Sequence, residues 1–179
     1  MRISVPAVSL ALALFGGTAR AADFDTVMKA WCTQAGEWRG DIDVTDAKAK
    51  MQRIALRTHH DCDPNAKLHT VRERFGDGES TVKVTYADAK ANVFRTEYFA
   101  GGTQRGYQYG FISVEMTDPA HWKTVIMTPP GTETYDGRPA LVRYVRIRNG
   151  DTVESLKEVQ YTDAPGEFRQ RSRIVQRRQ

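Results

Sequence analysis

Beyond a short N-terminal segment, hydrophobic and polar residues alternate along this chain with a period of two. Between residues 36 and 44, Trp38, Ile42 and Val44 alternate with charged side chains, as in a β-strand that buries one face. The same pattern predicts about ten strands, at residues 36–44, 52–59, 67–75, 80–87, 92–99, 104–114, 122–128, 140–148, 152–161 and 168–176. Most connections are short, and Asn149-Gly150 indicates a two-residue hairpin, because a type I′ turn needs positive φ at both positions.

One segment has a different period. Phe24, Val27, Met28 and Trp31 recur at the spacing of one helix face, which predicts a short helix over residues 23–33. An aspartate at its start can accept hydrogen bonds from the first free backbone N–H groups.

These elements predict an all-β fold, a single antiparallel up-and-down barrel that follows the short helix. A flat meander of about ten strands would leave two unpaired edges, and closure removes them by placing the last strand beside the first. Charge supports this pairing, because one face of the last strand is basic and one face of the first is acidic. The residues concerned are Arg169, Arg171 and Arg173 on the last strand and Glu37, Asp41 and Asp43 on the first. We interpret the C-terminal arginine run as an outward strand face and not as a patch for nucleic acid or acidic lipid.

The first residues have the composition of a secretory signal peptide. Arg2 precedes an apolar run at residues 5–15, and Ala19-Arg20-Ala21 matches the small-x-small cleavage pattern. We therefore expect residues 1–21 to be removed, which leaves one domain at residues 22–179, about 158 residues and enough for a single core.

The mature protein is accordingly expected to be exported, most simply to a bacterial periplasm. No later run is apolar for long enough to suggest a transmembrane segment. The formal net charge of +4 falls to about +2 without the leader, which is too little to indicate a nucleic-acid partner.

The stretch HHDCDP, which begins at His59, contains several residue types that bind metals. It also contains Cys62, and in an oxidising compartment Cys32 and Cys62 most simply form a disulfide, worth about 3–4 kcal/mol for a loop of this length. Asp63-Pro64-Asn65 is typical of a turn. His59 and His60 are adjacent and point to opposite faces of a strand, so they do not easily bind one ion together. We favour a turn and a disulfide over a metal site.

The first strand carries a motif as well as an alternation. GEWRG, residues 36–40, opens the predicted meander just after the helix, and it resembles the G-x-W signature of lipocalins and of the wider calycin group of small barrels. With about ten strands, the chain is more similar to the fatty-acid-binding and nitrobindin-like branches, and to bacterial exported proteins that start with G-x-W-x-G, than to eight-stranded lipocalins.

The resemblance implies roles for a few positions. In lipocalins the motif tryptophan plugs one end of the barrel and an arginine near the last strand packs across it, which would make Trp38 the plug. Arg171 and Arg173 are candidates for the arginine, but closure places both outward, which leaves Arg177. Nitrobindin-like proteins hold haem through a histidine near the C-terminus, and this chain has none after His121, so the same haem site is not expected and no cofactor is assigned.

A barrel of about ten strands is wider than side chains alone can fill, so an internal cavity is expected. Strand phase gives the candidate lining, which is Trp38, Ile42, Ile54, Leu56, Val84, Tyr86, Arg95, Tyr107, Tyr109 and Phe111.

Three alternatives stay open at this point. Over residues 92–99, either Phe94, Thr96 and Tyr98 face inward, or Arg95 does and could anchor a ligand carboxylate, although burying a charge without a partner is costly. The aromatic residues at 107–111 are either core or a ligand platform. The Pro- and Gly-rich connection at 129–139 is either a lid or a plain rim loop.

The sequence favours a barrel that binds or carries a small hydrophobic or amphipathic molecule. Two other hypotheses are an isomerase or cyclase that acts on such a molecule in the same cavity, and a fully packed interaction domain that binds nothing. No set of serine, histidine and acid with recognisable spacing points to catalysis.

Overall fold

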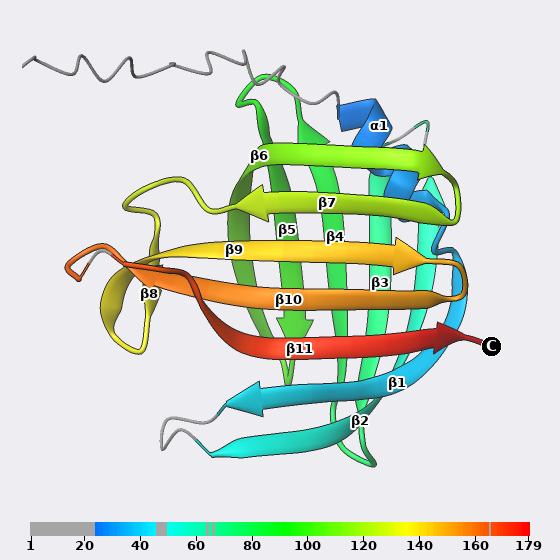
Figure 1. Ribbon diagram of the computed structural model, residues 1–179, viewed down its shortest axis with the longest axis horizontal. Coiled ribbons are helices and arrows are strands. Elements are labelled where there is room, and N and C mark those ends of the chain that lie inside the picture. The colour runs from blue at the N-terminus through cyan, green and yellow to red at the C-terminus, as the bar shows by residue number, and fades with distance from the viewer. Residues whose placement is uncertain (1–23, 46–49, 64, 66, 165) are drawn as a thin grey trace, which may run out of the picture.

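The computed structural model describes residues 24–45, 50–63, 65, 67–164 and 166–179, so the expected signal peptide lies outside the described residues. One helix is followed by eleven strands (Figure 1). They are α1 (Phe24–Cys32), β1 (Gly36–Thr45), β2 (Met51–Asp63), β3 (Leu68–Phe75), β4 (Ser80–Asp88), β5 (Val93–Ala100), β6 (Thr103–Asp118), β7 (His121–Met127), β8 (Glu133–Tyr135), β9 (Arg138–Asn149), β10 (Thr152–Tyr161) and β11 (Arg169–Arg178). Within this part of the chain, no helix is both long enough and apolar enough to cross a membrane.

The strands form the predicted closed antiparallel barrel. Consecutive strands pair from β1 to β7, then β7 pairs with β9, β9 with β10, β10 with β11, and β11 returns to β1. Ten strands complete the ring. The short strand β8 was not predicted; it lies in the 129–139 connection and pairs only with the start of β9. This architecture is compatible with the calycin group of barrels.

The ring closes along the ladder between β1 and β11, which runs from the pair Trp38–Arg178 to the pair Val44–Ser172. Gly40 sits within this ladder, and a Cβ atom there would lie 1.8 Å from the carbonyl oxygen of Val175. A side chain at this position would therefore collide with the backbone of the closing strand. The second glycine of GEWRG is required by the close approach of β11.

The predicted charge pairing across this ladder is largely wrong, although the strand pairing itself is confirmed. Only Asp43 and Arg173 lie directly opposite each other. Arg173 instead binds Glu154 on β10, with an Nε–Oε1 distance of 2.5 Å. A β-bulge shifts the register of β11 against β10, and Arg171 at this point is half-buried rather than fully outward. A β-bulge changes the direction in which a side chain points, so strict inward and outward alternation no longer predicts it.

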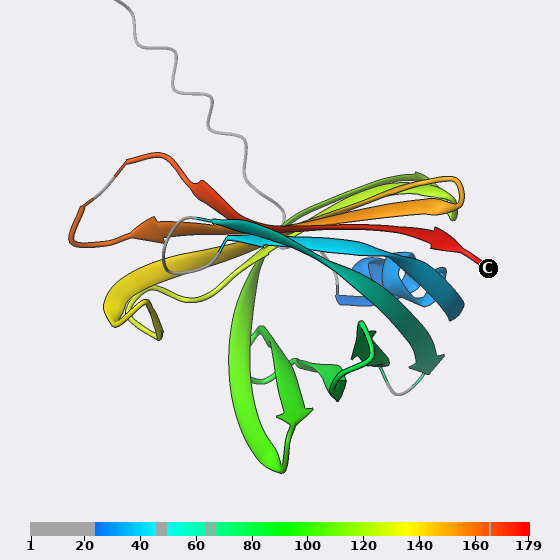
Figure 2. The ribbon, with the colours of Figure 1, turned by 90° about the horizontal axis from the view of Figure 1, so that it is seen from below.

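Helix α1 covers one end of the barrel, where Figure 2 shows it between two layers of strands. Its face of Val27, Met28, Ala30 and Trp31 is buried against the barrel core. The three tryptophans tie the segment down through their indole N–H groups. Trp31 donates to Thr124 Oγ1 (3.1 Å), Trp38 to the carbonyl oxygen of Gln34 (2.6 Å) and Trp122 to Thr33 Oγ1 (2.9 Å).

Trp38 lies fully buried at this closed end, with two guanidinium groups over its ring. Arg178 on β11 is 5.7 Å from the ring centroid and Arg148 on β9 is 5.5 Å away. The expectation of Arg177 as the arginine across Trp38 is wrong by one residue, because Arg177 is outward in the β11 register and Arg178 is inward.

The predicted disulfide is confirmed. Cys32 at the end of α1 bonds Cys62 near the end of β2, with the two Cα atoms 5.2 Å apart. The bond fastens the helix to the rim of the barrel, so it holds the cover of the closed end in place.

We predict that Gly40→Ala destabilises the protein by about 1–3 kcal/mol or more, because the new methyl group forces β1 and β11 apart. Urea denaturation measures the loss. Gly166→Ala is the matched control, since a Cβ there meets nothing within 4 Å. Equal stability of the two variants would contradict a closing ladder this tight.

We also predict that replacing both cysteines with alanine lowers the free energy of unfolding by about 3–4 kcal/mol, since the bond closes a loop with a sequence separation of 30 residues. Urea denaturation of the two forms measures the difference. Titration of the denatured, unreduced protein should find no free thiol at these positions, and two free thiols would refute the bond.

Candidate functional site

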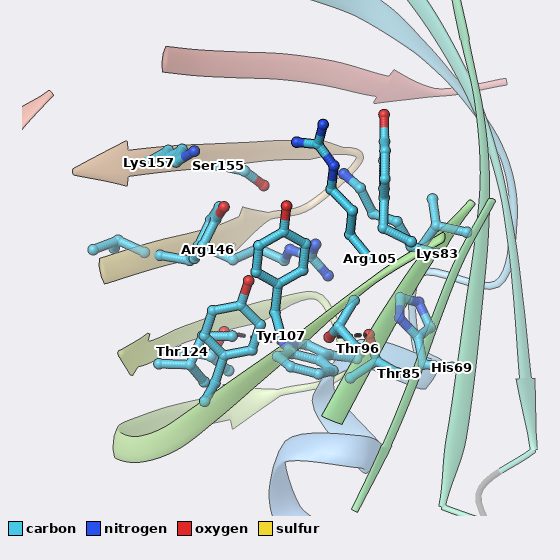
Figure 3. A pocket seen from close by; sticks show the side chains of 17 residues that line it. His69, Lys83, Thr85, Thr96, Arg105, Tyr107, Thr124, Arg146, Ser155 and Lys157 are labelled. Carbon is cyan, nitrogen blue, oxygen red and sulfur yellow. Dashed lines mark hydrogen bonds between the residues drawn. The ribbon is translucent and has the colours of Figure 1, made fainter. Parts of the chain in front are cut away.

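The barrel encloses a cavity of about 380 Å³ next to the end that α1 covers. Its wall comes from seven strands and the helix, and consists of Trp31, His69, Val71, Lys83, Thr85, Thr96, Tyr98, Arg105, Tyr107, Tyr109, Thr124, Ile126, Tyr144, Val145, Arg146, Ser155 and Lys157. Figure 3 shows His69 and Lys83 on the side of β3 and β4, with Arg146, Ser155 and Lys157 across the cavity on β9 and β10. The wall thus combines a mainly apolar surface with several charged and hydroxyl groups.

Four of the lining side chains are basic, and none of the lining side chains is acidic. They are Lys83, Arg105, Arg146 and Lys157. Lys83 has a partner in Glu73, at an Nζ–Oε1 distance of 2.8 Å, and the buried Glu73 also accepts from Thr81. Among the described residues, no carboxylate forms an ion pair with Arg146 or Lys157. The cavity therefore has an uncompensated positive charge.

Arg146 is held deep in the wall of the cavity. Its Nη1 donates to Gln34 Oε1 (3.2 Å), and its guanidinium lies 5.3 Å from the ring centroid of Trp31. Burial lowers its pKa to about 10, which still leaves it charged at neutral pH. A buried guanidinium with several N–H donors and one amide partner is prepared to bind an anion.

Lys157 projects from β10 into the same space. Its ammonium lies 4.6 Å from the ring centroid of Tyr135 and 6.0 Å from that of Tyr144. Burial lowers the pKa of Lys157, and repulsion from Lys83 lowers it further. An anion in the cavity would act against both effects, because a nearby negative charge favours the ammonium form.

Hydroxyl groups complete the wall. Thr85 and Thr96 are hydrogen-bonded to each other at 2.9 Å, and the rings of Tyr109 and Tyr144 pack edge to face at 5.5 Å. Burial raises the pKa of both phenols, so they stay neutral and remain able to donate hydrogen bonds. Together with the aromatic faces they form a wall that suits a molecule with polar and apolar parts.

The cavity continues toward the end of the barrel at β8. A second space of about 340 Å³ shares Arg105, Tyr107, Tyr109, Tyr144 and Lys157 with the first. Its own lining adds Glu133, Thr134, Tyr135 and Asp136 from β8 and the adjoining turn. The 129–139 connection therefore lies at the outer end of the cavity, and the two acidic residues of the lining, Glu133 and Asp136, lie there.

A pair of buried histidines lies beside the inner cavity. His60 Nδ1 and His69 Nε2 are 3.2 Å apart, and His60 Nε2 is 3.0 Å from Thr58 Oγ1. Gln176 donates to the same threonine oxygen at 2.9 Å. Burial lowers the pKa of His69 to about 3, helped by Arg146, and burial also lowers the pKa of His60, followed by repulsion from His69. Both rings are therefore neutral at pH 7.

HHDCDP divides between the two faces of β2, as its alternation predicts. His59 points outward, between Glu37 (2.6 Å) and Asp61 (3.0 Å), while His60 points inward. Across the described ranges, no group of three or more histidine, cysteine, aspartate or glutamate side chains is placed to hold a metal ion.

The structure brings only part of the predicted lining together. Tyr107 and Tyr109 line the cavity. Trp38 and Leu56 are buried on the inward face but lie outside the cavity wall, while Ile42 and Ile54 share that face and are half-buried. The side chain of Phe111 lies outside what the structure describes.

Three predicted lining residues do not face the cavity. On β4 the inward residues are Thr81, Lys83 and Thr85, so Val84 and Tyr86 lie on the opposite face. Arg95 faces away as well and binds Asp88, with an Nε–Oδ2 distance of 2.8 Å. On β5 the inward residues are Phe94, Thr96 and Tyr98, the alternative that needs no buried charge.

Sequence reasoning missed the basic residues because it assigned the apolar phase of each strand to the interior. The hairpin at Asn149-Gly150 contains the signal that could have found two of them. Its register pairs Ser155 with Arg146 and Lys157 with Tyr144, so once Tyr144 is placed inward, Lys157 follows. Likewise, only the β2–β3 register brings His69 beside His60.

Comparison with known proteins finds neither a family model that matches this chain nor a curated protein that resembles it.

We predict that the buried histidines make the protein less stable in mild acid. Their folded-state pKa values lie below the ordinary value of 6.5, so the unfolded chain binds more protons, and stability falls as the pH drops below 6.5 toward about 3. Each histidine contributes a slope of about 1.4 kcal/mol per pH unit in this range.

Urea denaturation between pH 6.5 and 5 measures this slope above the range in which carboxylates titrate. His69→Gln should reduce it, and His121→Gln, which removes a histidine from an exposed position, is the matched control. An identical slope in the wild type and in His69→Gln would rule out the buried pair as its origin.

Proposed function

We propose that this protein is an exported, lipocalin-like barrel that binds a small amphipathic molecule carrying an anionic group. The observation that carries the proposal is the inner cavity. Arg146 and Lys157 line it, and no carboxylate does. Cations buried without a carboxylate partner are costly, and a ligand anion would offset that cost.

The dimensions and chemistry of the cavity support a molecule of modest size. About 380 Å³ of inner space, continuous with a further 340 Å³, lies within the range of small-molecule sites in proteins. Aromatic rings and Val71, Val145 and Ile126 offer apolar contact, while the basic groups and hydroxyls are placed to hold a carboxylate, sulfonate or phosphate. A space of this volume also favours ligand binding over a fully packed interaction domain.

The sequence favoured a small hydrophobic or amphipathic ligand, and this cavity supports the amphipathic one. A fatty-acid-like molecule, with an acid group on an apolar body, agrees both with the cavity wall and with the calycin resemblance of GEWRG. Entry would occur from the end at β8, since α1 covers the other end.

Export to an oxidising compartment, most simply a bacterial periplasm, is part of the proposal. The Cys32–Cys62 disulfide supports it, because such bonds persist mainly outside the reducing cytosol. The proposed signal peptide at residues 1–21 is consistent with the same compartment.

The proposal predicts that the wild-type protein prefers an anionic probe to a neutral one of the same shape. Anilinonaphthalene sulfonate and N-phenyl-1-naphthylamine form such a pair, and fluorescence titration measures both. Lys157→Met should weaken binding of the sulfonate by about tenfold to a hundredfold, the usual range for one charge-assisted hydrogen bond, and should leave the neutral probe nearly unchanged.

Lys90→Met is the matched control, because it removes the same charge from an exposed turn outside the cavity. Equal affinity of the wild type for both probes, or equal losses in Lys157→Met and Lys90→Met, would contradict anion recognition inside the barrel.

A further inference from the structure

Four exposed arginines form a row across the outer surface of the barrel. Arg177 on β11 lies opposite Arg39 on β1, Arg39 lies opposite Arg57 on β2, and Arg57 lies opposite Arg74 on β3. All four are exposed. The four strands are neighbours in the ring, as Figure 1 shows for β11, β1 and β2. We refer to these residues as the arginine row.

The arginine row is unfavourable for the folded barrel itself. Like charges directly opposite each other on neighbouring strands repel and lower stability. Within the described part of the chain, none of these four side chains has an ion pair or a side-chain hydrogen bond, whereas Arg53, Arg95, Arg138 and Arg173 each bind an acid. No direct ion pair therefore offsets the repulsion in the row.

Other rows on the same surface place opposite charges side by side. Four residues along the strands from the arginine row, Arg173, Asp43 and Arg53 lie opposite one another in the order basic, acidic, basic. On the other side, Glu37 lies opposite His59 and hydrogen-bonds to it. The sheet thus contains the arrangement that stabilises it on both sides of the arginine row, and the row departs from that arrangement.

We propose that the arginine row binds a linear acidic polysaccharide that runs across the strands. Neighbouring strands are about 4.8 Å apart, so the row presents a guanidinium at that interval over about 14 Å. A sugar chain with carboxylate or sulfate groups presents anions along a line, and a guanidinium binds each of them through two parallel N–H groups.

The surroundings of the row favour such a chain over other polyanions. Glu37 and Asp41 flank Arg39 along β1, so a flat anionic membrane that reached the row would also have to meet those two acids. The outward positions next to the row along the strands contain no phenylalanine, tyrosine or tryptophan; they include Ala55, Val175 and Gln179. A single-stranded nucleic acid would lack the aromatic platforms on which its bases stack.

The test measures binding of fluorescently labelled heparin and polygalacturonate oligosaccharides, one sulfated and one carboxylated, by anisotropy at low and moderate salt. Arg57→Gln combined with Arg74→Gln should weaken binding of at least one of them by about tenfold or more, and should reduce the slope of log affinity against log salt concentration by about two. Arg53→Gln combined with Arg138→Gln removes the same charge from arginines that are ion-paired, and should change affinity by less than about threefold.

A folding readout accompanies the binding assay. The urea midpoint of the Arg57→Gln, Arg74→Gln protein should equal or exceed that of the wild type, because a repulsion is removed. If this pair folds poorly, Arg39→Gln combined with Arg177→Gln addresses the other half of the row and should give the same loss of binding.

Three results would overturn the proposal. The first is equal loss in the row variant and in the ion-paired control, which would indicate an effect of net charge alone. The second is no binding of either oligosaccharide by the wild type. The third is equal or tighter binding of single-stranded DNA or of phosphatidylglycerol vesicles. None of these results depends on the cavity, so the proposed ligand-binding function stands or falls separately.

Discussion

The structure depends on the antiparallel ladder between β1 and β11. This ladder joins the two ends of the chain and converts a meander into a closed ring, and it is possible only because Gly40 lets the backbone of β11 approach. Closure also decides which face of every strand is inside. Once Trp38 and Gln176 are directed inward by this ladder, the registers of the remaining hairpins direct each following residue in turn.

The interior has two regions of different character. At the closed end, the buried face of α1 packs against Phe94, Tyr109 and Trp122, and tryptophan indoles and the disulfide hold the helix there. Beyond this apolar region lies the cavity, whose wall carries hydroxyl and basic groups. The apolar end supplies much of the core, while the middle of the barrel contains buried cations that do not contribute to apolar packing. A packed end beside a polar cavity is typical of a rigid scaffold that positions a binding site.

The outer surface of the barrel also contains basic residues without an acidic partner. Ion pairs such as Arg53–Asp43 and Arg173–Glu154 give most of the sheet a compensated surface, and the arginine row stands out against them. Inside and outside, the informative charges are those that have no carboxylate partner in the fold. Each costs stability, so each points to a molecule that would supply the missing negative charge.

Much of the fold could be predicted from the sequence, because its signals are local. Period-two alternation located ten strands, and the spacing of the apolar residues from Phe24 to Trp31 located the helix. Two cysteines in a chain with an expected export signal indicated the disulfide. Which face of β4 and β5 is inside, which cations share the cavity and which arginines stand in one row depend on register between strands far apart in sequence. Register is set by closure and by bulges, and a shift of one residue reverses every side chain, so only the tertiary structure could decide these points.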